Sequence, residues 1–451
     1  MSTSLPLLLL LAAGSSAAPP PVKSPDLAKP IELMLPSAPD DAVLAGNGQY
    51  IAFTCPEAKQ IAVVDVTAGT IAKTIPFTEE DVRTVGTLSR LFVYTPRARS
   101  FQGYKVGKFE EDDKPKFLPA TAPNEGIGSL VAAPGVDGLV ILQFPKAKLT
   151  AGFGIFQPKP GFGALNWSHF GPTNAWGPVE LRISHTGTLL VGWGGGYAGL
   201  EAAVIRGVRA DVWEDQYKYG PVPWAMPSAD GQYIYLSAGQ LTRTMTFAGG
   251  QKKDQPYTFP AVDPGFYLTA PASEALAEGK GDRPVTRNSH GSGAMREVTL
   301  YTADNQQVVS VKADVLNVKM DLPPEKRVFF YNAASMLVRV GGPKKTTVKL
   351  ERLSLKDELD KAGGDYLVVA SAPTTATRNN KFTYPLTVLS KKGGVTAKLD
   401  RGPAGMKVSG TTLTWDVPFG FKDRYASFQV SVSDASGKTV LHLGQLVILN
   451  P

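Results

Sequence analysis

One short pattern recurs along this chain at a nearly constant spacing: small or polar residues, a tight turn, then four or five apolar or β-branched residues. The best copies are LAGNGQYIAFT (44–54), RISHTGTLLVGW (182–193) and MPSADGQYIYLS (226–237). Weaker copies are VGTLSRLFVYT (85–95), PGVDGLVILQF (134–144), VDPGFYLTA (262–270) and PPEKRVFFYN (323–332). The turns fall near residues 48, 89, 137, 187, 231, 264 and 325, about 46 residues apart on average, which indicates one repeated supersecondary unit.

The first copy can be assigned strand by strand. QYIAFT would be the second strand, KQIAVVDV (59–66) the third and TIAKTIPF (70–77) the outer fourth, with TAG as a hairpin turn. A four-stranded unit of this period is typical of a β-propeller blade, and a closed ring of blades has no exposed sheet edges. We therefore predict an all-β protein with a propeller of about seven blades over residues 31–360, six or eight being the alternatives.

This first repeat resembles the YVTN and WD-repeat-like propellers of exported bacterial proteins. Their repeat reads "dg…lyV…n…v.viD..tgkv…i", and the other copies match it mainly in the turn and the strand that follows. The resemblance extends over roughly residues 30–360 and implies a propeller that works outside the cytoplasm.

The repeated pattern ends at LKDELDKAGGD (355–365), a polar segment that predicts a short helix or linker. About seven short strands follow, which predicts an Ig-like β-sandwich over residues 361–451. Residues 402–439 also resemble the Ig-like domains, related to cadherin-like modules, of bacterial surface proteins. The residues that carry this resemblance are Pro403, Gly405, Met406, Leu413, Trp415, Asp434 and Gly437.

The amino terminus reads as a secretory signal over residues 1–18. An apolar run, too short to span a bilayer, precedes small residues, with Ala17 or Ala18 as the last residue before the cut. No Lys or Arg precedes the run, which leaves a cytosolic start as the alternative. Residues 19–30 would be a Pro-rich linker, and we expect a mature protein without a transmembrane segment that is secreted, periplasmic or at the cell surface.

Cysteine content and charge exclude several classes. Cys55 is the only cysteine, so no internal disulfide can form, and its position after YIAFT predicts a buried, unreactive thiol. The net charge of +7 comes from Lys and Arg scattered among nearly as many acids, without the long basic blocks that track phosphates. We therefore expect no nucleic-acid partner.

The stretch VGWGGGYAGLEAAVIRG (191–207) matches a dinucleotide-binding fingerprint, with glycines in the order G-x-G-x-x-G. In a Rossmann unit, residues 200–207 would form a helix. In a blade, HTGTLLVGW, EAAVIRG and RADVWEDQY would be successive strands. The blade is favoured because SHTGTLLV aligns with SADGQYIY and because no alternating strands and helices flank the stretch.

Other chemical candidates are weak. Ser289 and His290 are adjacent, which is not how a base meets its nucleophile in known triads, and we expect an exposed loop there. The four histidines are too far apart for a typical zinc site, and no cofactor is predicted. Asp434 could ligate calcium, as in some cadherin-like relatives, but an Asx-turn is favoured.

Aromatic residues are concentrated between residues 162 and 224, where five of the six tryptophans lie. Several of these rings fall in segments assigned to loops, where they could stack on sugars or peptide side chains. The alternative is that they pack between blades or cap the core. The candidate ligand-binding residues are Trp167, His169, Trp176, Trp193, Tyr197 and Tyr217.

These observations favour a monomeric, non-catalytic binding or scaffold protein that presents a propeller face to a glycan, peptide or protein partner. The first alternative is an enzyme built on the propeller, a hydrolase, lactonase or lyase acting on a sugar or lactone. The second is a dinucleotide- or quinone-dependent oxidoreductase.

Overall fold

The computed structural model of the chain describes residues 22–112, 114–118, 127–137, 140–143, 153–156, 179–194, 200–206, 209–215, 222–248, 255–275, 292–303, 305–312, 314–371 and 375–449. Within these ranges the regular structure is almost entirely β-strand, as predicted. The helical elements there are α1 (Ala272–Ala275), α2 (Leu355–Lys361) and the 3-10 helix η1 (Pro324–Lys326).

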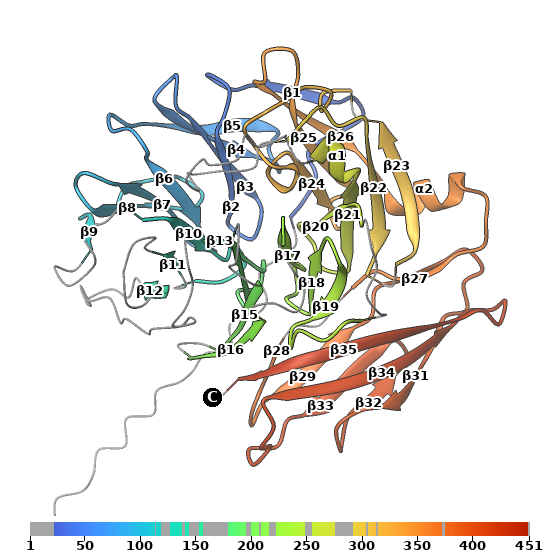
Figure 1. Ribbon diagram of the computed structural model, residues 1–451. Helices are drawn as coiled ribbons and strands as arrows, with labels where there is room; N and C mark the ends of the chain where they lie inside the picture. Colours follow the sequence, from blue (N-terminus) through green and yellow to red (C-terminus); the bar gives the residue numbers. More distant parts are fainter. Residues whose placement is uncertain are drawn as a thin grey trace, which may run out of the picture.

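Seven antiparallel sheets follow one another around a ring among the described residues, and we number them as blades 1 to 7 (Figure 1). Blade 1 contains β2 (Asp41–Ala45), β3 (Tyr50–Cys55), β4 (Gln60–Asp65) and β5 (Thr70–Pro76). Blade 2 contains β6 (Arg83–Gly86), β7 (Arg90–Thr95), β8 (Ser100–Lys105) and β9 (Lys116–Phe117). Blade 3 contains β10 (Ser129–Ala132), β11 (Val140–Gln143) and β12 (Phe153–Phe156).

The remaining blades continue the ring. Blade 4 contains β13 (Val179–Ile183), β14 (Leu189–Gly194), β15 (Leu200–Arg206) and β16 (Arg209–Asp215). Blade 5 contains β17 (Ala225–Pro227), β18 (Tyr233–Leu236) and β19 (Gly239–Thr242). Blade 6 contains β20 (Tyr257–Pro260), β21 (Phe266–Ala270), β22 (Glu297–Thr302) and β23 (Gln307–Lys312). Blade 7 contains β24 (Val328–Tyr331), β25 (Met336–Gly341), β26 (Thr347–Arg352) and β1 (Ile31–Met34).

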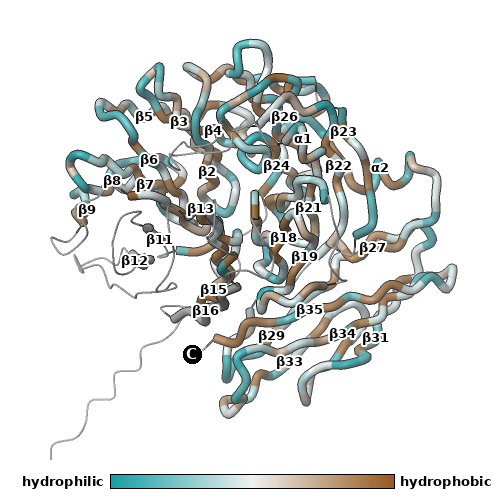
Figure 2. Tube along the Cα trace, in the orientation of Figure 1, coloured by the Kyte–Doolittle hydropathy of each residue, from teal (hydrophilic) through white to brown (hydrophobic). Residues whose placement is uncertain are grey.

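The burial of each strand follows its place in the blade. In blade 1 every residue of β3 is buried, whereas the outer strand β5 is mostly exposed. A strand covered by neighbouring blades on both faces must be apolar throughout, which is why the second strands read as continuous apolar runs. The strand assignment of the first repeat is confirmed, and the apolar residues line up along the strands of the ring (Figure 2).

The seventh predicted turn is misplaced. The turn expected near residue 325 is instead η1, which precedes the first strand β24, and the turn between β24 and β25 lies at residues 332–335. The segment VFFY was therefore assigned to the second strand of its blade and is in fact the first. Its uninterrupted apolar character misled the assignment, because the strand is buried on both faces like the second strands.

The ring is closed by the chain's own amino-terminal strand. Blade 7 receives β1 as its outermost strand, paired antiparallel with β26 in the register Ile31↔Leu350 to Met34↔Thr347. The first strands contact one another in ring order from β2 to β20, and η1 contacts both β20 and β2. One hydrophobic cluster joins blade 1, blade 7 and residues 22–35.

The carboxyl-terminal unit, residues 361–451, forms two main sheets around one hydrophobic core. The first sheet contains β28 (Thr375–Thr377), β35 (Thr439–Leu449), β34 (Tyr425–Ser433) and β31 (Thr396–Arg401). The second contains β29 (Lys381–Pro385), β33 (Thr412–Asp416) and β32 (Lys407–Ser409), and a separate pair is β27 (Leu367–Val369) with β30 (Val388–Ser390). Trp415, from the resemblance motif, is almost completely buried in this core.

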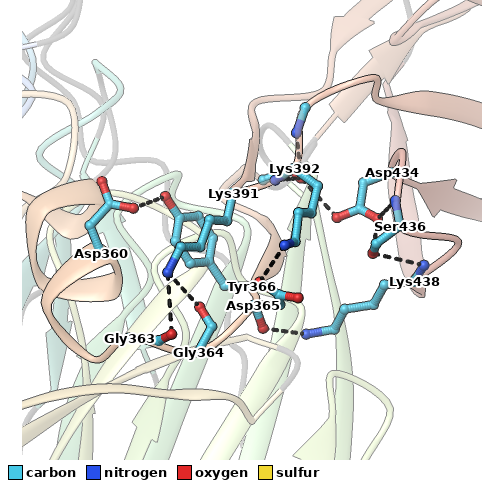
Figure 3. A network of polar contacts seen from close by, with 12 residues as sticks. Asp360, Gly363, Gly364, Asp365, Tyr366, Lys391, Lys392, Asp434, Ser436 and Lys438 are labelled. Carbon is cyan, nitrogen blue, oxygen red and sulfur yellow. Dashed lines mark hydrogen bonds and ion pairs between the residues drawn. The ribbon is translucent and has the colours of Figure 1, made fainter.

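One set of contacts holds this unit against the ring, and a second set stabilises the link between them. The Arg243 guanidinium of blade 5 is buried and donates to the Gln445 carbonyl at 3.2 Å, while the Gln445 amide donates to Gln232 at 3.1 Å. At the link after α2, the Lys392 ammonium lies 3.3 Å from Asp365, and the Tyr366 hydroxyl donates to Asp360 at 2.8 Å (Figure 3). These contacts fix the direction in which the chain leaves the propeller.

Two further predictions can be compared with the structure. The Ser436 amide donates to the Asp434 carboxylate at 2.9 Å, and the Ser390 hydroxyl donates to its other oxygen at 2.8 Å, so the Asx-turn interpretation is confirmed. Cys55 is free and buried, as expected, and burial raises the pKa of its thiol to about 11. Ser289 and His290 lie outside the described residues.

Candidate functional site

The centre of the ring contains a cavity of about 230 Å³ lined by the first strands of all seven blades. Its middle is apolar: half-buried side chains of Leu44, Leu130 and Ile183 face it from blades 1, 3 and 4. Each first strand leads from one end of this cavity to the turn at the other end, so the two ends carry different residues. A mostly apolar hollow with a few placed polar groups is the usual form of a ligand site.

Ion pairs surround the end at which the first strands begin, which we call the mouth. The Arg182 guanidinium lies 2.9 Å from the Glu325 carboxylate and 3.4 Å from that of Glu180. The Tyr257 hydroxyl donates to Glu325 at 2.9 Å. Although burial disfavours its charged form, the two carboxylates raise the pKa of Arg182 above the ordinary value. Its guanidinium also lies 5.3 Å from the centre of the Trp193 ring.

Two more cations complete the mouth. Lys326 of η1 forms an ion pair with Asp41, the first residue of β2, and joins blade 7 to blade 1. Arg83 of blade 2 donates to the Gly128 carbonyl of blade 3 at 2.6 Å. The described lining residues thus include equal numbers of cations and carboxylates. Each of these carboxylates, Asp41, Glu180 and Glu325, has a cationic partner.

The opposite end, the floor, is crossed by the turn of blade 1. Three consecutive residues, Gly46, Asn47 and Gly48, have φ values of 61°, 57° and 88°, the left-handed region that glycine and asparagine tolerate best. The Asn47 amide donates to the Pro134 carbonyl of blade 3 at 2.9 Å, and its side-chain oxygen lies 2.9 Å from Nε2 of His185 in blade 4.

These contacts have a geometric consequence. Blades 1 and 4 are separated by two blades, so a turn of blade 1 that reaches His185 must extend over the end of the channel. A side chain at Gly48 would place its Cβ 2.7 Å from Val262, which keeps the position glycine. The cavity is therefore a cup, with a charged mouth, apolar walls and a floor of polar turns.

His185 is held neutral at the floor. Burial lowers the pKa of its imidazole to about 4, and Nδ1 is buried without a hydrogen-bond partner. Since the Asn47 side-chain oxygen can only accept, Nε2 carries the proton and Nδ1 is left as a lone pair. This ring braces the floor, and among the described residues no carboxylate shifts its pKa or is placed to make it a general base.

Of the six candidate ligand-binding residues, Trp193 is the one within the described residues. Trp193 lies on β14 with 3% of its surface exposed, packed in the core beneath Arg182. Its ligand-binding role, like that of the others, stays a prediction. The other five residues lie outside the described residues: Trp167, His169, Trp176, Tyr197 and Tyr217.

The described residues of the fingerprint stretch belong to a blade. Residues 200–206 form β15, which pairs antiparallel with both β14 and β16, so the predicted succession of strands is confirmed. The helix that a Rossmann unit requires is replaced by a strand.

The cup itself was missed by sequence reasoning. Its charged residues precede or begin the first strands, which are short and carry no repeated letter pattern. Arg182 and Glu325 lie 143 positions apart and meet only because the ring closes. One weak sequence signal points to the mouth of the cup: a charged residue stands at or near the start of the apolar first strand in blades 1, 2, 4 and 7.

Comparisons with known proteins give fold-level likenesses. Neither a family model nor a curated protein matches this sequence. A chain of Raptor from Chaetomium thermophilum is 11% identical with a TM-score of 0.46, over 71% of this chain but only 28% of its own length. A chain of a mitotic checkpoint complex is 9% identical with a TM-score of 0.47, over 78% of this chain and 100% of that one. The Cps50 (Swd1) β-propeller domain of Myceliophteria thermophila is 9% identical with a TM-score of 0.35, over 72% and 100%.

The described residues contain neither a candidate metal site nor a candidate membrane-spanning helix. No group of three or more His, Cys, Asp and Glu there could hold a metal ion. No helix in that part of the chain has the length and hydropathy needed to cross a membrane.

The neutral state of His185 predicts a dependence of stability on acidity. Because the pKa of about 4 in the folded protein lies below the usual 6.5, the unfolded chain takes up the proton first, and acid destabilises the fold between pH 6.5 and 4. We expect His185→Gln to remove on the order of 2 kcal/mol of this loss, after allowance for partial exposure of the ring. Urea unfolding of the parent protein and of His185→Gln at a series of pH values measures this difference. If the free energy of unfolding falls equally in both proteins between pH 6.5 and 4, the prediction is contradicted.

Proposed function

We propose that this protein is a non-catalytic binding protein in which the central cup receives a small group of a partner. The single observation that supports it is the cup itself, lined by all seven blades, with apolar walls and a charge-balanced mouth. Apolar walls favour burial of an uncharged group, and the ion pairs at the mouth offer carbonyl and carboxylate acceptors and N–H donors to its polar end.

The size of the cup limits what enters. At about 230 Å³ it is smaller than the roughly 300–1,000 Å³ of sites that enclose drug-sized ligands. We infer that one side chain of a peptide or protein, or one terminal sugar unit of a glycan, enters while the rest of the partner lies across the mouth.

The alternative, a hydrolase, lactonase or lyase, draws on the acids and the histidine that line the same cup. Acid–base catalysis needs a group positioned to give or take a proton. Glu180 and Glu325 are engaged by Arg182, and Asp41 by Lys326, while His185 braces the floor through Asn47. This arrangement favours binding over catalysis.

We also propose that the chain is exported and that residues 361–451 are an Ig-like sandwich of the cadherin-like kind. Export is supported by the apolar run and small residues of positions 1–18. The Ig-like assignment is supported by two sheets around one core, with Trp415 and Met406 of the resemblance motif buried in it. A binding propeller with such an appended unit suits a place at the cell envelope or outside the cell.

Filling the cup tests the binding proposal. Ala132 lines it from β10, and Ala132→Phe would occupy part of the volume, whereas Ala68→Phe adds the same ring at an exposed turn of blade 1. Residues 19–451 would be screened on a glycan array and against a random peptide library. We expect Ala132→Phe to weaken every selected ligand by about ten-fold or more and Ala68→Phe to have no effect.

The same screen can contradict the proposal. If ligands are selected and Ala132→Phe, with an unchanged unfolding temperature, binds them as tightly as the parent protein, the cup is not the site. If no ligand is selected from either collection, the proposed ligand classes are wrong.

Export makes a separate prediction. On expression in a bacterium we expect cleavage after Ala17 or Ala18, seen as the mass of the mature chain outside the cytoplasm. Leu8→Arg, which interrupts the apolar run, should leave uncleaved protein inside the cell. Intact-mass measurement of each fraction decides this, and full-length protein confined to the cytoplasm would contradict the signal.

A further inference from the structure

The net charge of this protein is concentrated in its carboxyl-terminal unit. Residues 361–451 contain eleven lysines and arginines against five aspartates, a net charge of +6 out of +7 for the whole chain. The first 360 residues are therefore almost neutral. Charge gathered on a small unit at one side of a neutral ring indicates an interaction surface for an anionic partner.

The most exposed large apolar side chain described also lies in this unit. Phe419 is 75% exposed, in the loop of residues 417–424 that joins β33 to β34. The Phe421 amide donates to the Pro418 carbonyl at 3.1 Å, which makes Phe419 and Gly420 the corner of a turn. The ring therefore points away from the fold at a tight turn.

The loop that carries Phe419 is anchored on several sides. The Arg378 guanidinium donates to the Phe421 carbonyl at 2.7 Å and to the Asp423 carbonyl at 3.2 Å. The Val417 amide donates to the Asn380 carbonyl at 3.1 Å, and the Phe421 ring lies 5.1 Å from Trp415. An apolar ring held outward by a fixed turn loses little conformational freedom when it is buried by a partner.

Cations surround this loop. Lys381 stands opposite Asp416 at the base of the loop, and Lys422 lies within it; both are exposed. The neighbouring loop of residues 402–406 reaches the same end, since the Trp415 indole donates to the Ala404 carbonyl at 3.1 Å. We call this end the cationic tip, with Phe419 at its apex. Its six cations are Arg378, Lys381, Arg401, Lys407, Lys422 and Arg424, and the acids beside them are Asp400, Asp416 and Asp423.

The cationic tip faces away from the propeller's link. The Arg424 carbonyl accepts from the Ile448 amide, so the tip lies beside the carboxyl terminus, at the other end of the unit from α2 (Figure 1). The residues assigned to the cationic tip all come from residues 361–451, while the adjacent Tyr425 packs with Val447 and Leu449 against the hydrophobic cluster of the ring.

We propose that the cationic tip docks on a lipid bilayer that carries anionic headgroups. The cations would lie among the headgroups while Phe419 enters the boundary with the acyl chains, the combination by which peripheral proteins bind membranes. A soluble anionic polysaccharide would match the charge but would leave the projecting ring without an apolar layer to enter. The inference is independent of the cup and of any ligand bound there.

Vesicle binding tests the proposal on residues 19–451. We expect sedimentation with vesicles of phosphatidylcholine containing about one third phosphatidylglycerol, weak binding to phosphatidylcholine alone, and release by added salt. Phe419→Ser should weaken binding by about ten-fold. The double variant Lys381→Gln with Lys422→Gln should weaken it by roughly five-fold per charge removed.

Matched variants away from the cationic tip serve as controls. Leu441→Ser removes another exposed apolar side chain, 52% exposed, and Lys344→Gln with Lys345→Gln removes the same charge from an exposed turn of blade 7. These controls should bind vesicles like the parent protein. The proposal is overturned if the parent protein does not bind anionic vesicles, if correctly folded tip variants bind as well as the controls, or if dextran sulfate beads retain the protein while vesicles do not.

Discussion

The pairing of β1 with β26 is the contact on which the rest of the ring depends. Each blade is stable only between two neighbours, because both faces of its inner strands are apolar and must be covered. The last blade obtains three strands from residues 328–352 and its fourth from residues 31–34, which pair with β26 more than 300 positions later in the chain. Without that strand, the edge of β26 would be left open to pair with another chain. The pairing of β1 with β26 therefore joins the first and last segments of the propeller in one blade.

The cup exists because the ring is closed. Arg182 meets Glu325, and Lys326 meets Asp41, only when blades 4, 7 and 1 surround one axis. At the other end, the left-handed turn at Asn47 reaches over the axis to His185 and replaces an open channel by a floor. The carboxyl-terminal unit stands outside this construction. Its charge and its projecting Phe419 are carried by loops at the end opposite the link after α2, and none of the residues that line the cup belongs to them.

Local patterns predicted local structure well here. The turn-and-strand repeat predicts six of the seven turns, and the apolar runs predict the strands of the first repeat. In the carboxyl-terminal unit about seven strands were predicted and nine are described, because β28 was not predicted and KFTYPLTVLS forms both β29 and β30. The predictions that failed concern pairing and contacts between residues far apart in the sequence. VFFY was placed as a second strand because its letters do not record which neighbour pairs with it. Neither the fourth strand of blade 7 nor the mouth of the cup could be predicted from the sequence, because their partners lie 143 or more positions apart. Of the candidate ligand-binding aromatic residues, Trp193 alone lies in the described part of the chain, where it packs beneath Arg182, and the ligand-binding role of the cluster stays a prediction.

Closure by the amino-terminal strand can be measured directly with an engineered disulfide. Met34 and Thr347 are opposite each other in the β1–β26 register, at a separation that a disulfide between paired strands can span. The pair Met34→Cys and Thr347→Cys should oxidise readily and raise the unfolding temperature, and reduction should restore the original value. The pair Met34→Cys and Leu350→Cys, shifted along the strand, should not cross-link. Failure of the first pair to form, or equal formation of both, would contradict a ring closed by β1.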